Sequence, residues 1–172
     1  EETLSPMAQK ELCFELLKPI ADKIIAGCSG NHEYRAVKEV GMNPLYDVFC
    51  RMRIEDRYRE NACFIKLTVG KQGKNPNTYG VVLTHGSSKN KDEKWTYSVD
   101  GCDCFISGHT HLGTHQPMGK IRMDLSHNKV KTVGYQEVVV LPFQRYGGYA
   151  IRGKYVPKQL GQFQRIFLDG TR

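Results

Sequence analysis

The sequence predicts a layered α+β fold, with helices near the N-terminus and strands in the rest of the chain. Residues up to 58 carry apolar side chains at helical spacing, whereas residues 61–168 alternate short apolar runs with Gly, Asn or Pro turns. The chain has 172 residues, and 40% of them are hydrophobic, which is enough for one domain with its own core. We therefore expect a single domain over residues 1–172.

Two helices are predicted in the first third of the chain. Leu12, Leu16 and Ile20 recur every four residues and predict one buried helical face, which Pro19 should kink or restart. A second helix is predicted over 44–58. Its inward side chains are expected to be Leu45, Val48, Phe49 and Met52.

Strands are predicted where short apolar runs lie between turn residues. They cover 24–28, 62–69, 78–84, 102–107, 120–125, 129–141, 149–152 and 163–168. The segments 120–125 and 129–141 should pair as a hairpin, and the polar stretch 87–94 should be a loop.

Charge and cysteine usage limit the classes of partner and compartment. The net charge of +7 favours anionic partners, and no run approaches the roughly 18 apolar residues of a membrane span.

The tail 144–172 interleaves six cations with aromatic residues, which suits single-stranded nucleic acid but also an ordinary β-rich tail with a polar face. Six cysteines show no CxxC or zinc-finger spacing, so we expect free thiols and a cytoplasmic protein.

Three polar clusters each follow a predicted strand, where sheet-based enzymes bind their ligands. They are GNHE at 30–33, THG at 84–86 and GHTH at 108–111. Taken singly, the first two are more often ordinary turn residues. In an extended segment His109 and His111 would point the same way and form a metal-binding pair. The Asn31 amide oxygen can bind a metal without adding charge, and four of the six histidines fall in these clusters.

The order and spacing of the three clusters resemble the later signature blocks of the calcineurin-like metallophosphoesterases, over residues 24–141. The resemblance implies a layered α/β/β/α sandwich with two divalent metal ions (Mn²⁺, Fe²⁺ or Zn²⁺) between facing sheets. Such ions hold phosphate oxygens and a hydroxide that attacks phosphorus.

The same resemblance implies a role for each matching residue. Asn31, His85 and His109 would bind the second metal, and His111 the first. His32 would be the general acid or the cation that stabilises the phosphoryl charge. Glu33 would buttress the loop. Apart from the resemblance, Arg35 could bind a substrate phosphate or else pack on the following helix, and His115 could line the pocket or be an ordinary loop residue.

The chain departs from this family at its start. The family pattern begins with Asp-x-His and Gly-Asp blocks, and neither occurs before Gly30. We therefore expect a domain truncated at its N-terminus that binds at most one metal ion, weakly, with little or no turnover. An incomplete sheet would leave an open edge, through which copies of the chain could self-associate.

The expected partner is a phosphate-ester substrate, with nucleic acid favoured by the positive charge, and no membrane. The segment 144–157 resembles the tail of uncharacterised, phage-encoded phosphoesterases. The rival hypothesis is a non-catalytic, basic nucleic-acid-binding module that retains a partial metal site. The sequence upstream distinguishes the two hypotheses, because Asp-x-His and Gly-Asp blocks there would support the enzyme, whereas replacement of their carboxylates would support the module.

Overall fold

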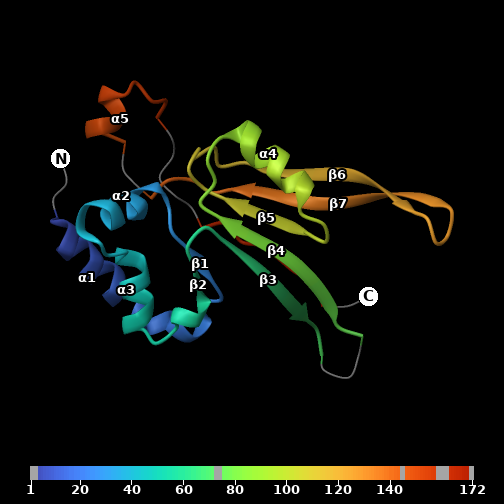
Figure 1. Ribbon diagram of the computed structural model, residues 1–172, viewed down its shortest axis with the longest axis horizontal. Helices are drawn as coiled ribbons and strands as arrows, with labels where there is room; N and C mark the ends of the chain where they lie inside the picture. Colours follow the sequence, from blue (N-terminus) through green and yellow to red (C-terminus); the bar gives the residue numbers. More distant parts are fainter. Residues whose placement is uncertain (1–3, 72–74, 144–145, 158–162, 171–172) are drawn as a thin grey trace. The chain divides into compact units, whose positions relative to one another are not determined.

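The fold is mixed α+β, built from helices, a two-stranded sheet and a five-stranded mixed sheet (Figure 1). The computed structural model describes residues 4–71, 75–143, 146–157 and 163–170. The chain groups into two compact units, and each is described here by itself. The first comprises 1–63, 83–85 and 146–157, and the second comprises 64–82, 86–145 and 158–172.

The first unit is mainly helical. Its elements are α1 (Pro6–Leu17), the 3₁₀ helix η1 (Lys18–Lys23), β1 (Gly27–Cys28), α2 (Asn31–Val40), α3 (Pro44–Arg51), the 3₁₀ helix η2 (Glu55–Arg57), β2 (Tyr58–Arg59) and α5 (Gly148–Arg152). Strands β1 and β2 pair in parallel, with Gly27 opposite Tyr58. The restart predicted at Pro19 is confirmed, because α1 ends at Leu17 and η1 begins one residue later.

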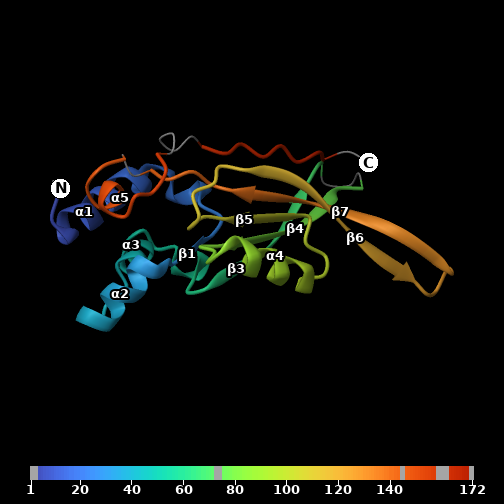
Figure 2. The same ribbon diagram turned by 90° about the horizontal axis from the view of Figure 1, so that it is seen from above.

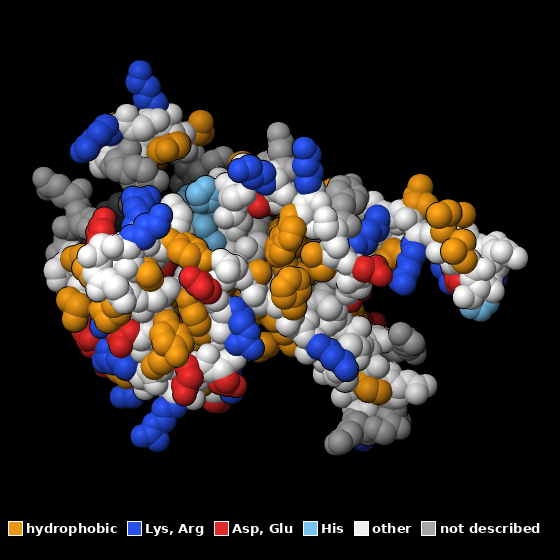
Figure 3. Space-filling model, in the orientation of Figure 1, with side chains coloured by type: hydrophobic (Ala, Val, Ile, Leu, Met, Phe, Trp, Pro, Cys, Tyr) orange, Lys and Arg blue, Asp and Glu red, His pale blue; other side chains and the backbone are white. Residues whose placement is uncertain are grey.

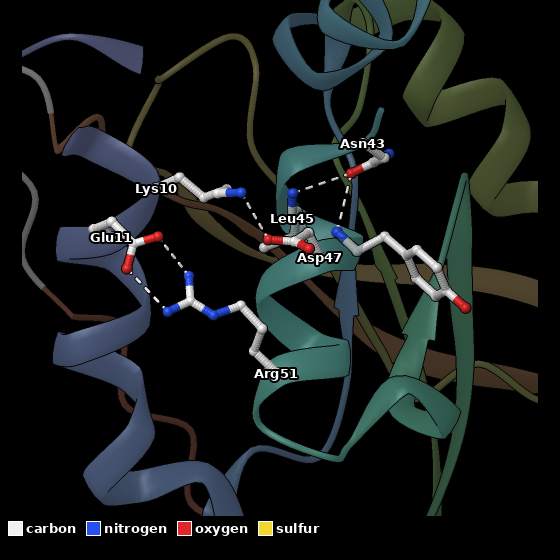
Figure 4. A network of polar contacts seen from close by, with 7 residues as sticks. Lys10, Glu11, Asn43, Leu45, Asp47 and Arg51 are labelled. Atoms are coloured by element: carbon white, nitrogen blue, oxygen red, sulfur yellow. Dashed lines mark hydrogen bonds and ion pairs between the residues drawn. The ribbon is translucent and has the colours of Figure 1, made fainter. Parts of the chain in front are cut away.

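The prediction that Leu12, Leu16 and Ile20 form a buried face of the first helix is wrong. Leu12, Leu16 and Ile20 are 47%, 65% and 43% exposed. Helix α1 instead meets α3 through a neighbouring stripe, where Lys10 binds Asp47 at 2.8 Å (Figure 4). On the same stripe Glu11 accepts two hydrogen bonds from Arg51, at 2.6 and 2.9 Å, and the Phe14 ring lies 3.9 Å from the Arg51 guanidinium. Charge pairing and a cation–π contact therefore decide which stripe faces the neighbouring helix.

The predicted helix 44–58 is shorter than expected, because α3 ends at Arg51. Arg53 takes the left-handed conformation (φ 60°), which cannot continue an α-helix. The expected inward side chains Val48 and Phe49 are buried. The predicted strand 24–28 is also shorter, since only Gly27–Cys28 pairs with a neighbour.

The five-stranded sheet belongs mostly to the second unit. Its strands are β3 (Ala62–Val69), β4 (Asn77–Thr84), β5 (Cys104–Ser107), β6 (His115–Asp124) and β7 (Lys129–Val139), in the order β3-β4-β5-β7-β6. Strands β5 and β7 are parallel, whereas β6 and β7 form the predicted antiparallel hairpin. The ends of β3 and β4, residues 62–63 and 83–84, are grouped with the first unit.

Side chains are buried on both faces of this sheet. Val81, Cys104 and Val138 form one cluster, together with partly buried side chains from β3 and β5. Their chain neighbours Val82 and Phe105 form a second cluster with Cys102, as the alternation of a strand requires. Helix α4 (Lys89–Ser98) covers this second face, where the Trp95 ring lies 5.7 Å from the Phe105 ring.

Three local predictions are wrong. The expected loop 87–94 contains the start of α4, because the Asp92 carboxylate accepts hydrogen bonds from the backbone and hydroxyl of Ser87 and fixes that turn. The expected strand 149–152 lies in α5, since a short apolar run fits either element. Residues 163–168 form no strand in the described structure, although Asp169 accepts hydrogen bonds from Asn77 and Tyr79.

All six cysteines are free thiols. Across the described ranges, no helix has the length and apolar character needed to cross a bilayer. In the tail expected to bind nucleic acid, Arg145, Lys158 and Arg172 lie outside the described residues.

Candidate functional site

Two of the expected metal ligands meet within the first unit. Asn31 is the first residue of α2, and His85 follows the last residue of β4. The Asn31 Oδ1 atom lies 2.8 Å from His85 Nε2, although the two residues are 54 positions apart in the chain. An amide oxygen and an imidazole nitrogen therefore converge on one point.

Gly30 makes this contact possible. A Cβ atom at position 30 would lie 2.6 Å from His85 Nδ1 and 2.8 Å from its Cε1 atom. The φ of Gly30 is −109°, which any residue can adopt, so the glycine is needed for space rather than for the turn itself. Glu33 buttresses the turn as expected, because its Oε2 atom accepts a hydrogen bond of 2.8 Å from the Gly30 N–H.

A closed polar network holds the segment just before Gly30. The Asn43 Nδ2 group donates to Ser29 Oγ at 2.8 Å and to the Tyr58 hydroxyl at 2.9 Å, and the two hydroxyls are 2.8 Å apart. Ser29 is only 2% exposed. Asn43 Oδ1 also caps α3 by accepting from the N–H groups of Leu45 and Tyr46 (Figure 4). One side chain thus ties the turn at 29–31 to the start of α3.

Cys28 adds a second connection to His85, whose backbone forms a hydrogen bond to the Cys28 thiol. Burial, followed by the nearby Cys63, raises the pKa of Cys28 to about 11. Cys28 is therefore a neutral thiol at physiological pH and not an activated nucleophile.

His32 and Arg35 lie on α2 beyond Asn31, and both are exposed. Their spacing of three residues makes them neighbours on the helix surface. They lie near the N-terminal end of a ten-residue helix, where the backbone dipole favours a negatively charged group.

The GHTH cluster follows β5 in the second unit, and the expectation of an extended segment there is wrong. His109 and His111 both take left-handed backbone conformations, with φ of 57° and 53°. Between them the Thr110 N–H donates to the Gly108 carbonyl at 2.6 Å, which closes a tight turn. The simple rule that residues i and i+2 share a side therefore does not apply to this pair.

The positive φ values of His109 and His111 indicate local backbone strain. Each costs roughly 1–2 kcal/mol relative to an ordinary conformation, and such residues gather at functional sites. His111 is half-buried and His109 is exposed. Two of the four expected ligands, Asn31 and His85, thus belong to the first unit, and the other two belong to the second.

Sequence reasoning missed a small polar cavity in the second unit. It has a volume of about 30 Å³ and is lined in part by Asp92, Thr110 and Glu137. Asp92 and Glu137 are 9% and 8% exposed. This volume suits a single water molecule. Glu137 lies within an apolar strand, and such a buried acid is the signal that could have revealed the cavity.

His115 lies apart from that cavity's lining. It is the exposed first residue of β6, and its Nε2 atom lies 2.8 Å from Gln136 Oε1.

Within the described part of the chain, no group of three or more His, Cys, Asp or Glu side chains could hold a metal ion.

Comparison of this chain with protein-family models, curated proteins and solved structures gives no match.

Proposed function

We propose that this chain is a metal-dependent phosphoesterase of the calcineurin-like metallophosphoesterase type, with that family's layered α/β/β/α sandwich. The observation that carries the proposal is the 2.8 Å separation of Asn31 Oδ1 and His85 Nε2. Two turns far apart in the sequence bring together the donor atoms that the motif comparison assigns to one metal ion.

The 2.8 Å contact is a hydrogen bond between His85 Nε2 and Asn31 Oδ1. The same imidazole nitrogen and amide oxygen are donor atoms that could hold a divalent ion. The mixed oxygen and nitrogen donors favour Mn²⁺, Fe²⁺ or Zn²⁺ over Ca²⁺.

The remaining ligands that the family resemblance assigns are His109 and His111. The left-handed conformations of both histidines support this role, because strained backbone is retained where a side chain must be aimed. Three ligands for one position and one for the other give an expected stoichiometry of at most one weakly bound ion per chain.

Residues of α2 would act on the phosphate ester. Divalent ions, when bound, neutralise phosphoryl charge and supply activated water. His32 would protonate the leaving oxygen or stabilise its charge, and Arg35, three residues on, would bind a phosphate oxygen. Both side chains are exposed, as a group that meets substrate must be.

The alternative remains a non-catalytic, basic nucleic-acid-binding module with a partial metal site, which the net charge of +7 favours. The two proposals share the metal ligands and differ in turnover. Because the chain supplies three ligands for one metal position and one for the other, the expected hydrolysis is slow. Slow metal-dependent hydrolysis supports the enzyme, whereas metal binding with no hydrolysis of any phosphodiester supports the module.

The test is Mn²⁺ binding by isothermal titration calorimetry, together with hydrolysis of bis(p-nitrophenyl) phosphate. We expect Asn31→Ala and His85→Ala each to weaken Mn²⁺ binding by at least about 10-fold. His127→Ala is the matched control, because its imidazole contacts Asp124 and lies on an exposed turn. Equal Mn²⁺ affinity in all three variants, or no binding by the unaltered protein, contradicts the proposed site.

A further inference from the structure

The far part of the β6–β7 hairpin is a two-stranded ribbon. In the described structure β5 pairs only with residues 136–139 of β7, at its C-terminal end. The pairing of β6 with β7 continues outward from there to Asp124 opposite Lys129. Figures 1 and 2 show this part of the hairpin extending beyond β5. Both strands of the ribbon are therefore accessible over most of their length.

The ribbon has two chemically different faces. Directly opposed residues of an antiparallel pair lie on the same face. Lys120, Arg122, Lys129 and Lys131 share one face, which we call the cationic face, together with Asp124 and Val133. The opposite, aliphatic face carries Ile121, Met123, Val130 and Thr132.

In Figure 3 hydrophobic and Lys or Arg side chains occupy different parts of this far end, at the right of the view. Ile121, Met123 and Val130 are 77%, 71% and 71% exposed.

Positive charge on the cationic face is only partly balanced. Arg122 lies directly opposite Lys131, and like charges at such positions are destabilising. Asp124 is the one acid between residues 118 and 134, and Lys131 and His127 already contact it at 2.8 and 3.0 Å. The 3.6 Å ion pair of Arg122 with Asp100 joins two highly exposed side chains and contributes little. An anionic partner would neutralise this repulsion between like charges on the cationic face.

We propose that the cationic face binds the phosphate backbone of double-stranded nucleic acid. A two-stranded β-ribbon fits the major groove, which is about 12 Å wide. Residues 118–134 contain no Phe, Tyr or Trp on which an unpaired base could stack, so a duplex fits better than a single strand. This inference deepens the proposed function, on which it rests, by naming duplex nucleic acid as the phosphate-ester substrate class.

An interfacial membrane element carries cations on one face and buries the opposite face in the bilayer through Trp, Phe or Leu. The paired positions of the aliphatic face hold none of these three residue types, and they include Thr132, whose hydroxyl would enter the bilayer. A phosphate backbone needs only the cationic face, so the ribbon fits nucleic acid better than a membrane.

The test measures binding of a short fluorescent DNA duplex by anisotropy, in EDTA and between about 50 and 200 mM salt. The double variant Arg122→Gln/Lys131→Gln removes two cations from the ribbon. Each lost phosphate contact should reduce the slope of log K against log salt by about 0.9, so the slope falls by about 2 and the affinity by at least about 10-fold. The matched control is Lys66→Gln/Lys71→Gln, which removes the same charge from exposed positions elsewhere in the second unit.

Three results would overturn the proposal. One is an equal loss of affinity in the ribbon and control variants, or no duplex binding at all. Another is tighter binding of a single strand than of the duplex. The third is binding to anionic phosphatidylserine vesicles that Met123→Ser weakens, which would make the aliphatic face the contact. Because binding is measured without metal, failure here leaves the Mn²⁺ test of Asn31 and His85 independent.

Discussion

Replacing Gly30 by alanine tests the geometry of the candidate site directly. The added Cβ would lie 2.6, 2.8 and 2.9 Å from three atoms of the His85 ring. Ordinary contacts between such atoms are about 3.5–4.0 Å, so the ring must move by about 1 Å. A displacement of that size lengthens the 2.8 Å contact between His85 Nε2 and Asn31 Oδ1 beyond the range of a hydrogen bond.

The expected cost follows from two terms. Overpacking of a tight contact costs about 1–3 kcal/mol, and a lost neutral hydrogen bond costs about 1 kcal/mol. We expect Gly30→Ala to lower the free energy of unfolding by about 2–4 kcal/mol. For a chain of this size that corresponds to a fall in Tm of about 4–16 °C. Mn²⁺ affinity should fall by at least about 10-fold, because a ligand is no longer aimed correctly.

The assay combines urea denaturation followed by circular dichroism with Mn²⁺ titration calorimetry. Gly147→Ala is the control, because a Cβ at that position has no atom within 4 Å. Both variants lose the same unfolded-chain entropy, so their difference isolates the contact with His85. If Gly30→Ala is as stable as Gly147→Ala and binds Mn²⁺ as tightly as the unaltered protein, our account of the Asn31–His85 contact is wrong.

Four further predictions concern other parts of the chain. His111→Gly relieves about 1–2 kcal/mol of strain at the observed φ of 53° but adds about 0.5–1 kcal/mol of unfolded-chain freedom, so the free energy of unfolding should rise by at most about 1 kcal/mol, while Mn²⁺ affinity falls. Asn43→Ala should cost about 2–3 kcal/mol through the lost helix cap and hydroxyl network, and Asn43→Ser, which keeps a capping oxygen, should cost less. Phe105→Ala should cost about 3–5 kcal/mol in urea denaturation, since that ring is 0% exposed. Burial raises the pKa of both Cys28 and Cys104 to about 11, from an ordinary value of 9.0, so iodoacetamide at about pH 8 should alkylate them about 100-fold more slowly in the folded than in the unfolded chain.

The pH dependence that follows from the two thiols has a definite sign. Folding holds them in the neutral form, so their contribution to stability is complete below the unfolded pKa of 9.0. It is lost as the pH rises through about 11, and the urea midpoint should fall over that window. A midpoint that is flat or rises from pH 9 to pH 11 contradicts this assignment, as does rapid alkylation of Cys28 or Cys104 in the native protein.

Outcomes that would contradict the other three predictions are equally direct. A less stable His111→Gly variant would mean that its imidazole contributes more than its backbone strain costs. Equal stability of Asn43→Ala and Asn43→Ser would show that the side-chain cap of α3 does not contribute to the free energy of unfolding. A loss below about 1 kcal/mol for Phe105→Ala would show that the cavity collapses or that the ring is not in the core.

The sequence by itself determined much of the local structure. The strand predicted over 62–69 matches β3, because polar and apolar residues alternate there between turn residues. The hairpin of β6 and β7 was predicted for the same reason, although β6 begins earlier, at His115. The segment 149–152 was assigned wrongly, because a short apolar run fits a helix or a strand until its neighbours are known.

The sequence also identified the residues of the candidate site, because amide and imidazole groups that follow strand ends carry donor atoms that can bind a metal ion. Only the tertiary structure decided that Asn31 and His85 meet, because no local rule connects positions 54 residues apart. The same is true of the space at Gly30, which is set by a ring from a distant strand end. Local preference depends on a few neighbouring residues, whereas these contacts depend on how the whole chain packs.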